Sequence, residues 1–303
     1  TWTQSLENDA PTGSGFRKSV KTFCTIAKAS LGGADVGIIR QCLEGQDLQR
    51  ISKGTASAQQ LTLSFWVKSN VTGTYIANLN DDDNSRTIAA SYTISASATW
   101  ERKTITFAAD TTGAFDNDNA GSLYVDFWLF GGTTYTSGTL ATAWQATAPA
   151  NQAVGQTNLA AARNNYLQIT GVQLEVGPTA TGFEFKSYGQ ELAECQRYYQ
   201  RFVSSGSLEA RVPAMCLTQS PTVGRITVFH PVTMRTAATS VDHSGVRITD
   251  NLSFSSSDCA MTIGNSSNAA TLLNCTMTGA GTGSGYSVYI NGASAYLGLS
   301  AEL

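Results

Sequence analysis

The chain of 303 residues is longer than one average domain, so two domains are the starting expectation. Charged residues make up only 14% of it, and Ser, Thr, Asn, Gln and Gly take their place, which indicates a surface of neutral hydrogen-bonding groups. The net charge of −3 argues against a nucleic-acid partner, which needs clustered Lys and Arg, and no apolar run is long enough to insert into a membrane.

Alternation of apolar and polar residues with period two dominates the first half of the chain. In 61–68 and again in 123–130, every second residue is a core-type apolar residue, which predicts strands that each bury one face. Further strands are predicted at 74–79, 88–94, 102–107 and 166–176. Turns rich in Asp and Asn separate these segments, and many short strands with such turns indicate a jelly-roll β-sandwich.

Residues 191–202 break this pattern because they lack Gly, Pro and β-branched residues. Leu192, Cys195, Tyr199 and Phe202 recur at helical spacing, so a short connecting helix is predicted here. After it the chain is again strand-like. The predicted strands are 208–217, 224–234, 244–254, 259–263, 269–276, 286–290 and 295–302.

The two halves differ in composition, because all five tryptophans lie before residue 150. The sequence therefore predicts a mainly β protein with a jelly-roll domain at 1–188, a helix and linker at 189–206, and a second, smaller β-sandwich at 207–303. No internal repeat of 20–50 residues is present, so a parallel β-helix is not supported.

Five segments carry a resemblance to a known family. They are 44–50 (EGQDLQR), 61–69, 110–119 (DTTGAFDNDN), 171–177 (GVQLEVG) and 188–199 (YGQELAECQRYY). In this order they resemble a module of tail-fibre-like and other structural proteins of tailed bacteriophages, over roughly residues 15 to 200. The resemblance implies a galactose-binding-like jelly roll, similar to carbohydrate-binding modules. The C-terminal residues 231–235 and 295–303 resemble the β domains that end phage fibres, which implies a homotrimer.

Motifs for catalysis are absent from the sequence: it has no G-x-S-x-G, P-loop, H-E-x-x-H or dinucleotide-binding glycine pattern. Glu175 and Glu184 could form a carboxylate pair for glycoside hydrolysis, although both are more simply strand or loop residues. His230 follows a predicted strand and is interpreted as structural. We therefore expect a protein that is not an enzyme.

Aromatic residues suggest a sugar-binding surface instead. If 61–68 and 123–130 bury their aliphatic sides, Trp66, Tyr124 and Trp128 point the opposite way. Flat aromatic rings suit the apolar faces of pyranoses, and Asp126 could accept hydrogen bonds from hydroxyl groups. The alternative is that these aromatic side chains lie under another strand, a loop or a neighbouring subunit.

The acidic turn at 116–119 is a second candidate site. Asp116 and Asp118 have the i, i+2 spacing that could hold a structural calcium ion, whereas a solvated turn is the simpler interpretation. No other cofactor is expected. The six cysteines have no metal-ligand spacing, and free thiols are expected for a phage protein that assembles in the reducing cytoplasm of its host.

The leading hypothesis is an adhesive structural protein of a phage virion, a tail fibre or receptor-binding appendage that contacts host-surface glycans. The alternatives are a capsid-attached fibre or decoration protein with a structural role and, third, a polysaccharide hydrolase. Expected partners are two further copies of the chain, other virion proteins and host cell-surface polysaccharide. Neither nucleic acid nor membrane insertion is expected.

Overall fold

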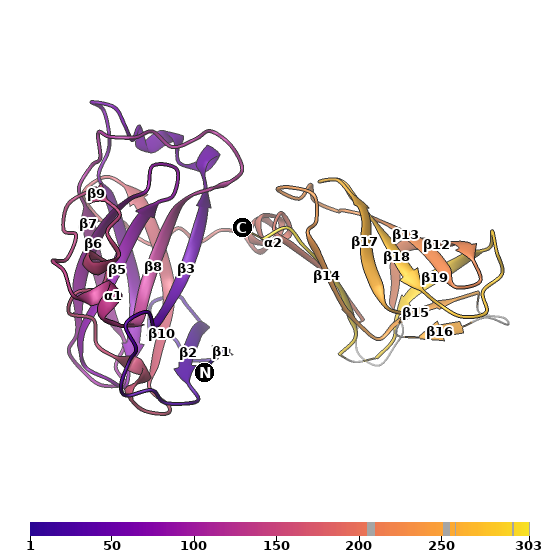
Figure 1. Ribbon diagram of the computed structural model, residues 1–303, viewed down its shortest axis with the longest axis horizontal. Coiled ribbons are helices and arrows are strands. Elements are labelled where there is room, and N and C mark those ends of the chain that lie inside the picture. The colour runs from indigo at the N-terminus through magenta and orange to yellow at the C-terminus, as the bar shows by residue number, and fades with distance from the viewer. Residues whose placement is uncertain (205–209, 251–254, 258, 293, 303) are drawn as a thin grey trace. The chain divides into compact units, whose positions relative to one another are not determined.

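The computed structural model describes residues 1–204, 210–250, 255–257, 259–292 and 294–302 (Figure 1). The chain divides into two compact units, Thr1–Glu184 and Phe185–Leu303. Antiparallel strands dominate both units, so the predicted mainly β class is confirmed. No helix in the described ranges is long and apolar enough to span a membrane.

The first unit is a sandwich of two five-stranded sheets, with strand orders β1-β2-β10-β4-β7 and β3-β8-β5-β6-β9. The first sheet contains β1 (Trp2–Glu7), β2 (Ser19–Cys24), β10 (Tyr166–Val176), β4 (Leu61–Ser69) and β7 (Glu101–Phe107). The second sheet contains β3 (Val36–Glu44), β8 (Gly121–Gly131), β5 (Gly73–Asp81), β6 (Arg86–Ile94) and β9 (Gln145–Ala146). Apart from β1 and β9, this distribution of strands is that of a jelly roll, as the sequence predicted.

Short helical segments lie in the connections of this unit: η1 (Gly45–Asp47), η2 (Gln49–Ile51), α1 (Thr133–Thr136), η3 (Pro149–Asn151) and η4 (Leu159–Ala161). The core lies between the two sheets. It contains the alternate residues Leu61, Leu63, Phe65 and Val67 of β4 and Leu123, Val125, Phe127 and Leu129 of β8. Both strands therefore bury the face that their alternation predicted.

Strand β10 loses one neighbour halfway along its length. It pairs with β2 only from Tyr166 to Ile169, and its register with β4 shifts between Thr170 and Gln173. Gly171 lies in this bulge with a φ of +59°, and the Phe16 ring lies so close that a Cβ at this position would be 2.5 Å from it. Beyond the bulge β10 pairs with β4 alone, so one edge of the sandwich is open there.

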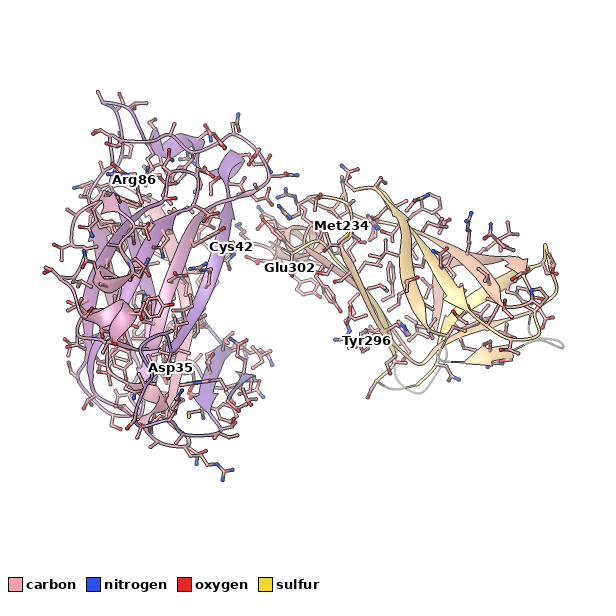
Figure 2. The ribbon with its side chains drawn as sticks, in the orientation of Figure 1. Asp35, Cys42, Arg86, Met234, Tyr296 and Glu302 are labelled. Atoms are coloured by element: carbon pink, nitrogen blue, oxygen red, sulfur yellow. The ribbon has the colours of Figure 1, made fainter. Side chains whose placement is uncertain are left out.

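A buried ion cluster ties three connections of the first unit together. The Lys53 ammonium contacts carboxylate oxygens of Asp81 at 2.5 Å and Asp110 at 3.1 Å, and it donates to the carbonyl oxygens of Thr112 and Gly113. Arg86, labelled in Figure 2, donates two hydrogen bonds to Asp110. Burial raises the pKa of Asp110, but hydrogen bonds from Arg86, from the Thr112 amide and from Lys53 outweigh it and keep that pKa below its ordinary value.

The second unit packs a seven-stranded sheet, β16-β15-β19-β12-β13-β18-β17, against a three-stranded sheet, β11-β20-β14. The strands of the large sheet are β12 (Ala210–Ser220), β13 (Val223–Phe229), β15 (Val246–Thr249), β16 (Ser255–Ser257), β17 (Met261–Ser266), β18 (Ala270–Thr276) and β19 (Gly285–Ile290). The small sheet contains β11 (Tyr199–Val203), β14 (Ser240–Ser244) and β20 (Tyr296–Ser300). The predicted linker end at 205–206 and parts of the predicted strands 208–217 and 244–254 lie outside the described residues.

The predicted helix 191–202 is wrong in its second half. Helix α2 spans Tyr188–Gln196, and the Ser187 hydroxyl accepts a hydrogen bond from the Gln190 amide at its start. The chain then forms β11, which pairs along its whole length with β20, and Phe202 packs against the core of the second unit. Pairing with a strand nearly one hundred residues later therefore overrides the local helical spacing of Tyr199 and Phe202.

All six cysteines are free, and two of them touch inside the second core. The sulfur atoms of Cys216 on β12 and Cys275 on β18 lie 3.7 Å apart. Between them β13 carries Gly224, where a Cβ would lie 2.5 Å and 2.8 Å from the two sulfurs and 2.3 Å from the Met277 methyl group. Position 224 therefore has room for a hydrogen atom only.

Replacing Gly224 by alanine is expected to destabilise the second unit by about 1–3 kcal/mol, because the added methyl group overpacks a closed core. Hydrogen exchange of the β12 and β18 amides measures this unit separately from the first. Gly285→Ala is the matched control, since its nearest neighbour is the mobile end of exposed Met215 at 3.4 Å. Equal exchange rates in the two variants would contradict the close packing at position 224.

Candidate functional site

The four residues of the predicted sugar platform do not come together. Trp66 belongs to β4 in one sheet, whereas Tyr124, Asp126 and Trp128 belong to β8 in the other sheet. Both strands turn their aliphatic sides to the shared core, so the remaining side chains lie on opposite outer faces of the sandwich. The prediction that β4 and β8 contribute to a single sugar-binding surface is therefore wrong.

Trp128 is not at the surface, because only 2% of it is exposed. Its ring packs with Ile76, Ala89, Ala141 and Ala153 in a second cluster, which forms where the connection after β8 covers this sheet. The indole Nε1 donates to the Asn78 side chain at 3.1 Å, and Tyr135 contacts the ring. The alternative considered from the sequence, that a loop covers this aromatic side chain, is correct for Trp128.

Asp126 is also buried, with 1% exposure, and its oxygens are engaged within the chain. Arg40 donates to both carboxylate oxygens at 2.7 Å, and the Asn80 amide donates to one of them. The Arg40 guanidinium in turn lies 4.5 Å from the centre of the Tyr124 ring. Asp126 therefore orders Arg40 and Tyr124 rather than facing solvent as a sugar acceptor.

Tyr124 and Trp66 remain partly exposed, each on its own sheet. The Tyr124 hydroxyl donates to Asp82 at 2.9 Å, and partial burial followed by this bond raises the pKa of Tyr124 to about 12. Trp66 lies between Thr170 of β10 and Arg102 of β7. Neither of these two rings lies on the surface beside another aromatic residue of the predicted sugar-binding set.

The acidic turn at 116–119 forms hydrogen bonds with its own and a neighbouring connection. An Asp118 carboxylate oxygen accepts a hydrogen bond from the Ala120 amide at 2.9 Å, as a turn residue does. The Asp116 amide donates to Asp83. Within the described ranges, no three His, Cys, Asp or Glu side chains are grouped in a way that could hold a metal ion.

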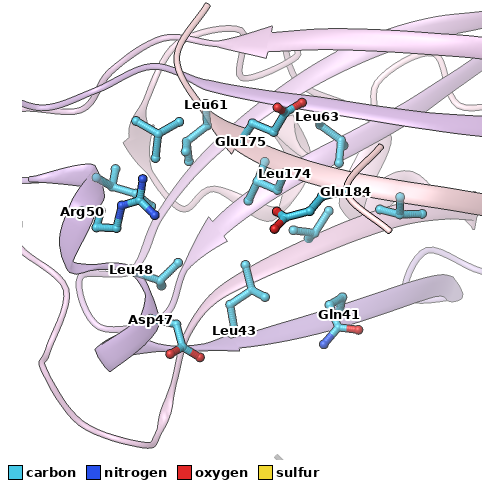
Figure 3. A pocket seen from close by; sticks show the side chains of 14 residues that line it. Gln41, Leu43, Asp47, Leu48, Arg50, Leu61, Leu63, Leu174, Glu175 and Glu184 are labelled. Atoms are coloured by element: carbon cyan, nitrogen blue, oxygen red, sulfur yellow. The ribbon is translucent and has the colours of Figure 1, made fainter. Parts of the chain in front are cut away.

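A hollow of the first unit opens where β10 no longer pairs with β2. It has a volume of about 540 Å³ and lies between β3, the η1–η2 connection and the second half of β10 (Figure 3). Its floor is aliphatic, and Val172 and Val176 at its edge are 40% and 43% exposed. We call it the β3–β10 groove. Its lining residues are Gln41, Leu43, Asp47, Leu48, Arg50, Ile51, Leu61, Leu63, Val125, Val172, Leu174, Glu175, Val176 and Glu184.

Three charged side chains at the rim of the β3–β10 groove are available to a ligand. Asp47, Arg50 and Glu184 are exposed, and none of them belongs to an ion pair of the described chain. Figure 3 shows Arg50 and Glu184 pointing toward the middle of the groove from opposite sides. The groove therefore combines an aliphatic floor with hydrogen-bonding groups of both signs.

Glu175 lines the β3–β10 groove, but its carboxylate is engaged by Thr181, which donates from both its amide and its hydroxyl group. Slight burial raises the pKa of Glu175, but hydrogen bonds from Thr181 and Gln173 outweigh it and hold that pKa below its ordinary value. A general acid of a glycosidase needs a raised pKa. Glu175 is therefore unsuited to that role.

Sequence reasoning missed this groove because its lining residues alternate like those of any half-buried strand. The sequence predicts a strand at 166–176, and Leu174 and Val176 of this strand pair with Leu63 and Leu61 on its core-facing side. They are left partly uncovered only because β2 ends its pairing at Ile169, which is a long-range feature. Gly171 within this strand was the available signal for a bulge.

Comparison with known proteins does not assign the chain to a family. No family model matches it, and no curated protein matches it. The enzymatically active domain of tailspike protein 4 of bacteriophage CBA120 is 14% identical with a TM-score of 0.30, over 58% of this chain and 18% of that chain. A Penaeus vannamei nodavirus structure has 9% identity and a TM-score of 0.20, over 92% and 95% of the two chains. Cucumber necrosis virus has 12% identity and a TM-score of 0.17, over 99% and 90%.

Proposed function

We propose that this chain is an adhesive structural protein of a bacteriophage virion, a tail fibre or receptor-binding appendage, whose first unit binds host-surface glycans in the β3–β10 groove. The observation that carries the proposal is the groove itself. Its volume of about 540 Å³ is in the range of ligand-binding pockets. Its aliphatic floor suits the apolar face of a sugar ring, and its carboxylate, amide and guanidinium groups match sugar hydroxyls.

The phage context comes from the sequence resemblance, and that resemblance coincides with the groove. Three of the five segments that carry it, 44–50, 61–69 and 171–177, contribute lining residues. A shared module that keeps its motif segments around one hollow is what a common binding role would produce. Homotrimeric assembly and contacts with other virion proteins belong to the same proposal, since many weak sites on one particle give avidity.

Binding without cleavage is the proposed chemistry. Glu175 and Glu184 both line the groove, which is the arrangement a hydrolase would need, but the lowered pKa of Glu175 makes that carboxylate a poor proton donor. Incubating the chain with host polysaccharide and measuring reducing ends tests this point. Sustained release of reducing ends that Glu184→Gln abolishes would favour the hydrolase instead.

Replacing Val172 by asparagine is expected to weaken glycan binding about tenfold, because a polar amide then interrupts the aliphatic edge of the groove without changing its charge. The measurement is a glycan array probed with the full chain at high density, followed by titration of the strongest ligand. Val20→Asn is the matched control, because Val20 is 39% exposed and does not line the groove. Equal loss in both variants, or no loss in either, would contradict the proposed site.

Immunolabelling of the virion separates the proposal from the structural alternative. An appendage at the tail tip places the chain where it meets the host. A chain found only on the capsid, with no hit on the array, would favour a decoration protein.

A further inference from the structure

We infer that the β3–β10 groove selects its glycan by charge, so that a sugar carrying a protonated amine binds best, a neutral sugar binds less well and an acidic sugar is excluded. This inference rests on the proposed function and names the class of ligand. It follows from the fixed charges around the groove and from what each of them contacts.

The groove carries more negative than positive charge. Asp47, Glu175 and Glu184 line it, against Arg50 as its one cationic lining residue. Asp47 and Glu184 are exposed and have no ion-pair partner among the described residues, so their charges are not neutralised within the chain. An ammonium group on a sugar bound beside Glu184 would meet a carboxylate without an ion-pair partner there, and Asp47 adds a second negative charge to the same lining.

Arg50 does not reverse this preference. Figure 3 shows its guanidinium directed across the groove toward Glu184, so an anionic group that approached Arg50 would also approach the Glu184 carboxylate. Charges that approach one another within the screening length of about 8 Å to 10 Å at physiological ionic strength are only partly screened, so an anionic group between Arg50 and Glu184 is still repelled by Glu184. Arg50 is better placed to donate hydrogen bonds to neutral hydroxyl oxygens.

The net charge of the first unit also favours cationic ligands. The first unit has fifteen Asp and Glu residues and twelve Lys and Arg residues, whereas the second unit has seven of each kind. The negative excess therefore belongs to the unit that contains the groove, and it favours the approach of cationic ligands.

The test uses three oligosaccharides of equal length: glucosamine, N-acetylglucosamine and galacturonate oligomers, which are cationic, neutral and anionic. Affinities for the full chain are measured by calorimetry at two salt concentrations. The expected order is glucosamine, then N-acetylglucosamine, then galacturonate, with the preference shrinking at high salt. Glu184→Gln, which keeps the shape of the side chain, should reduce glucosamine affinity about fivefold. It should leave N-acetylglucosamine affinity within about twofold, because a neutral sugar forms no charge pair with Glu184.

Controls separate groove binding from general attraction of a polycation. Glu191→Gln removes an exposed carboxylate from α2 in the second unit and should leave all three affinities unchanged. Arg50→Gln should not weaken glucosamine binding. An equal loss in Glu184→Gln and Glu191→Gln would overturn the inference, because the attraction would then come from net charge.

Failure of the inference and failure of the proposed function are distinguishable. Equal affinity for the three oligomers, or tightest binding of galacturonate, overturns charge selection but leaves the proposal of glycan binding intact. The same holds if the array shows groove-dependent binding to neutral sugars alone. Absence of binding to all three oligomers, together with an array free of hits that depend on Val172, overturns the proposed function itself.

Discussion

Replacing Lys53 by methionine lowers the free energy of unfolding of the first unit by about 3–5 kcal/mol, because it leaves buried carboxylates without their cation. The Lys53 and Asp81 side chains are 2% and 0% exposed, so water cannot replace the lost partner. Asp110 keeps Arg86, but Asp81 loses its cation. Denaturant unfolding followed by tryptophan fluorescence reports this unit alone, since every tryptophan of the chain precedes residue 150.

Lys28→Met is the matched control for this experiment. Lys28 pairs with Asp35 at 2.6 Å, but its side chain is 57% exposed, and such surface pairs contribute about 0–1 kcal/mol. The two substitutions remove the same atoms from an ion pair and differ in burial. Unfolding midpoints that shift equally would show that the Lys53 cluster is not desolvated as described.

Replacing Trp128 by alanine destabilises the first unit by a similar amount, about 3–5 kcal/mol, because it empties a closed cluster of apolar side chains. It also leaves the buried Asn78 side chain without the indole donor. The same fluorescence-detected unfolding measures the change, using the four remaining tryptophans.

Trp66→Ala is the informative comparison for Trp128→Ala. Trp66 is only partly buried, so its loss should cost less stability. If the two residues formed one exposed sugar platform, both variants would fold like the parent chain and both would lose binding. A Trp128→Ala variant with unchanged stability would therefore contradict the buried position of this ring.

Alternation in the sequence predicts the strands that bury one apolar face in the core. Strands β4 to β8 and β10 lie within a few residues of their predicted ranges because their apolar faces meet the core along most of their length. Strands β1, β2 and β3 were not predicted. Two of them, β1 and β3, are sheet edges, and their partly exposed side chains weaken the alternation.

The candidate site was harder to predict than the fold, for a physical reason. Alternation tells which side chains leave the core, but not what covers them afterwards. Trp128 lies under the connection that follows β8, and Asp126 accepts hydrogen bonds from Arg40 of another strand. The floor of the β3–β10 groove, conversely, consists of core-type residues that a neighbouring strand does not cover. Both outcomes depend on contacts between distant segments.

The contact between Cys216 and Cys275 has a consequence for how the second unit responds to oxidation. Their strands, β12 and β18, are both neighbours of β13 and are not neighbours of each other. Strands in a sheet are roughly 4.8 Å apart, which places the two α-carbons roughly 9–10 Å apart, whereas a disulfide needs less than about 7 Å. The two sulfurs can be in contact over Gly224, but they cannot form a disulfide unless the backbone of β13 is displaced from between their strands. An oxidising medium therefore leaves Cys216 and Cys275 without a covalent crosslink, and reducing agents have no bond between them to break.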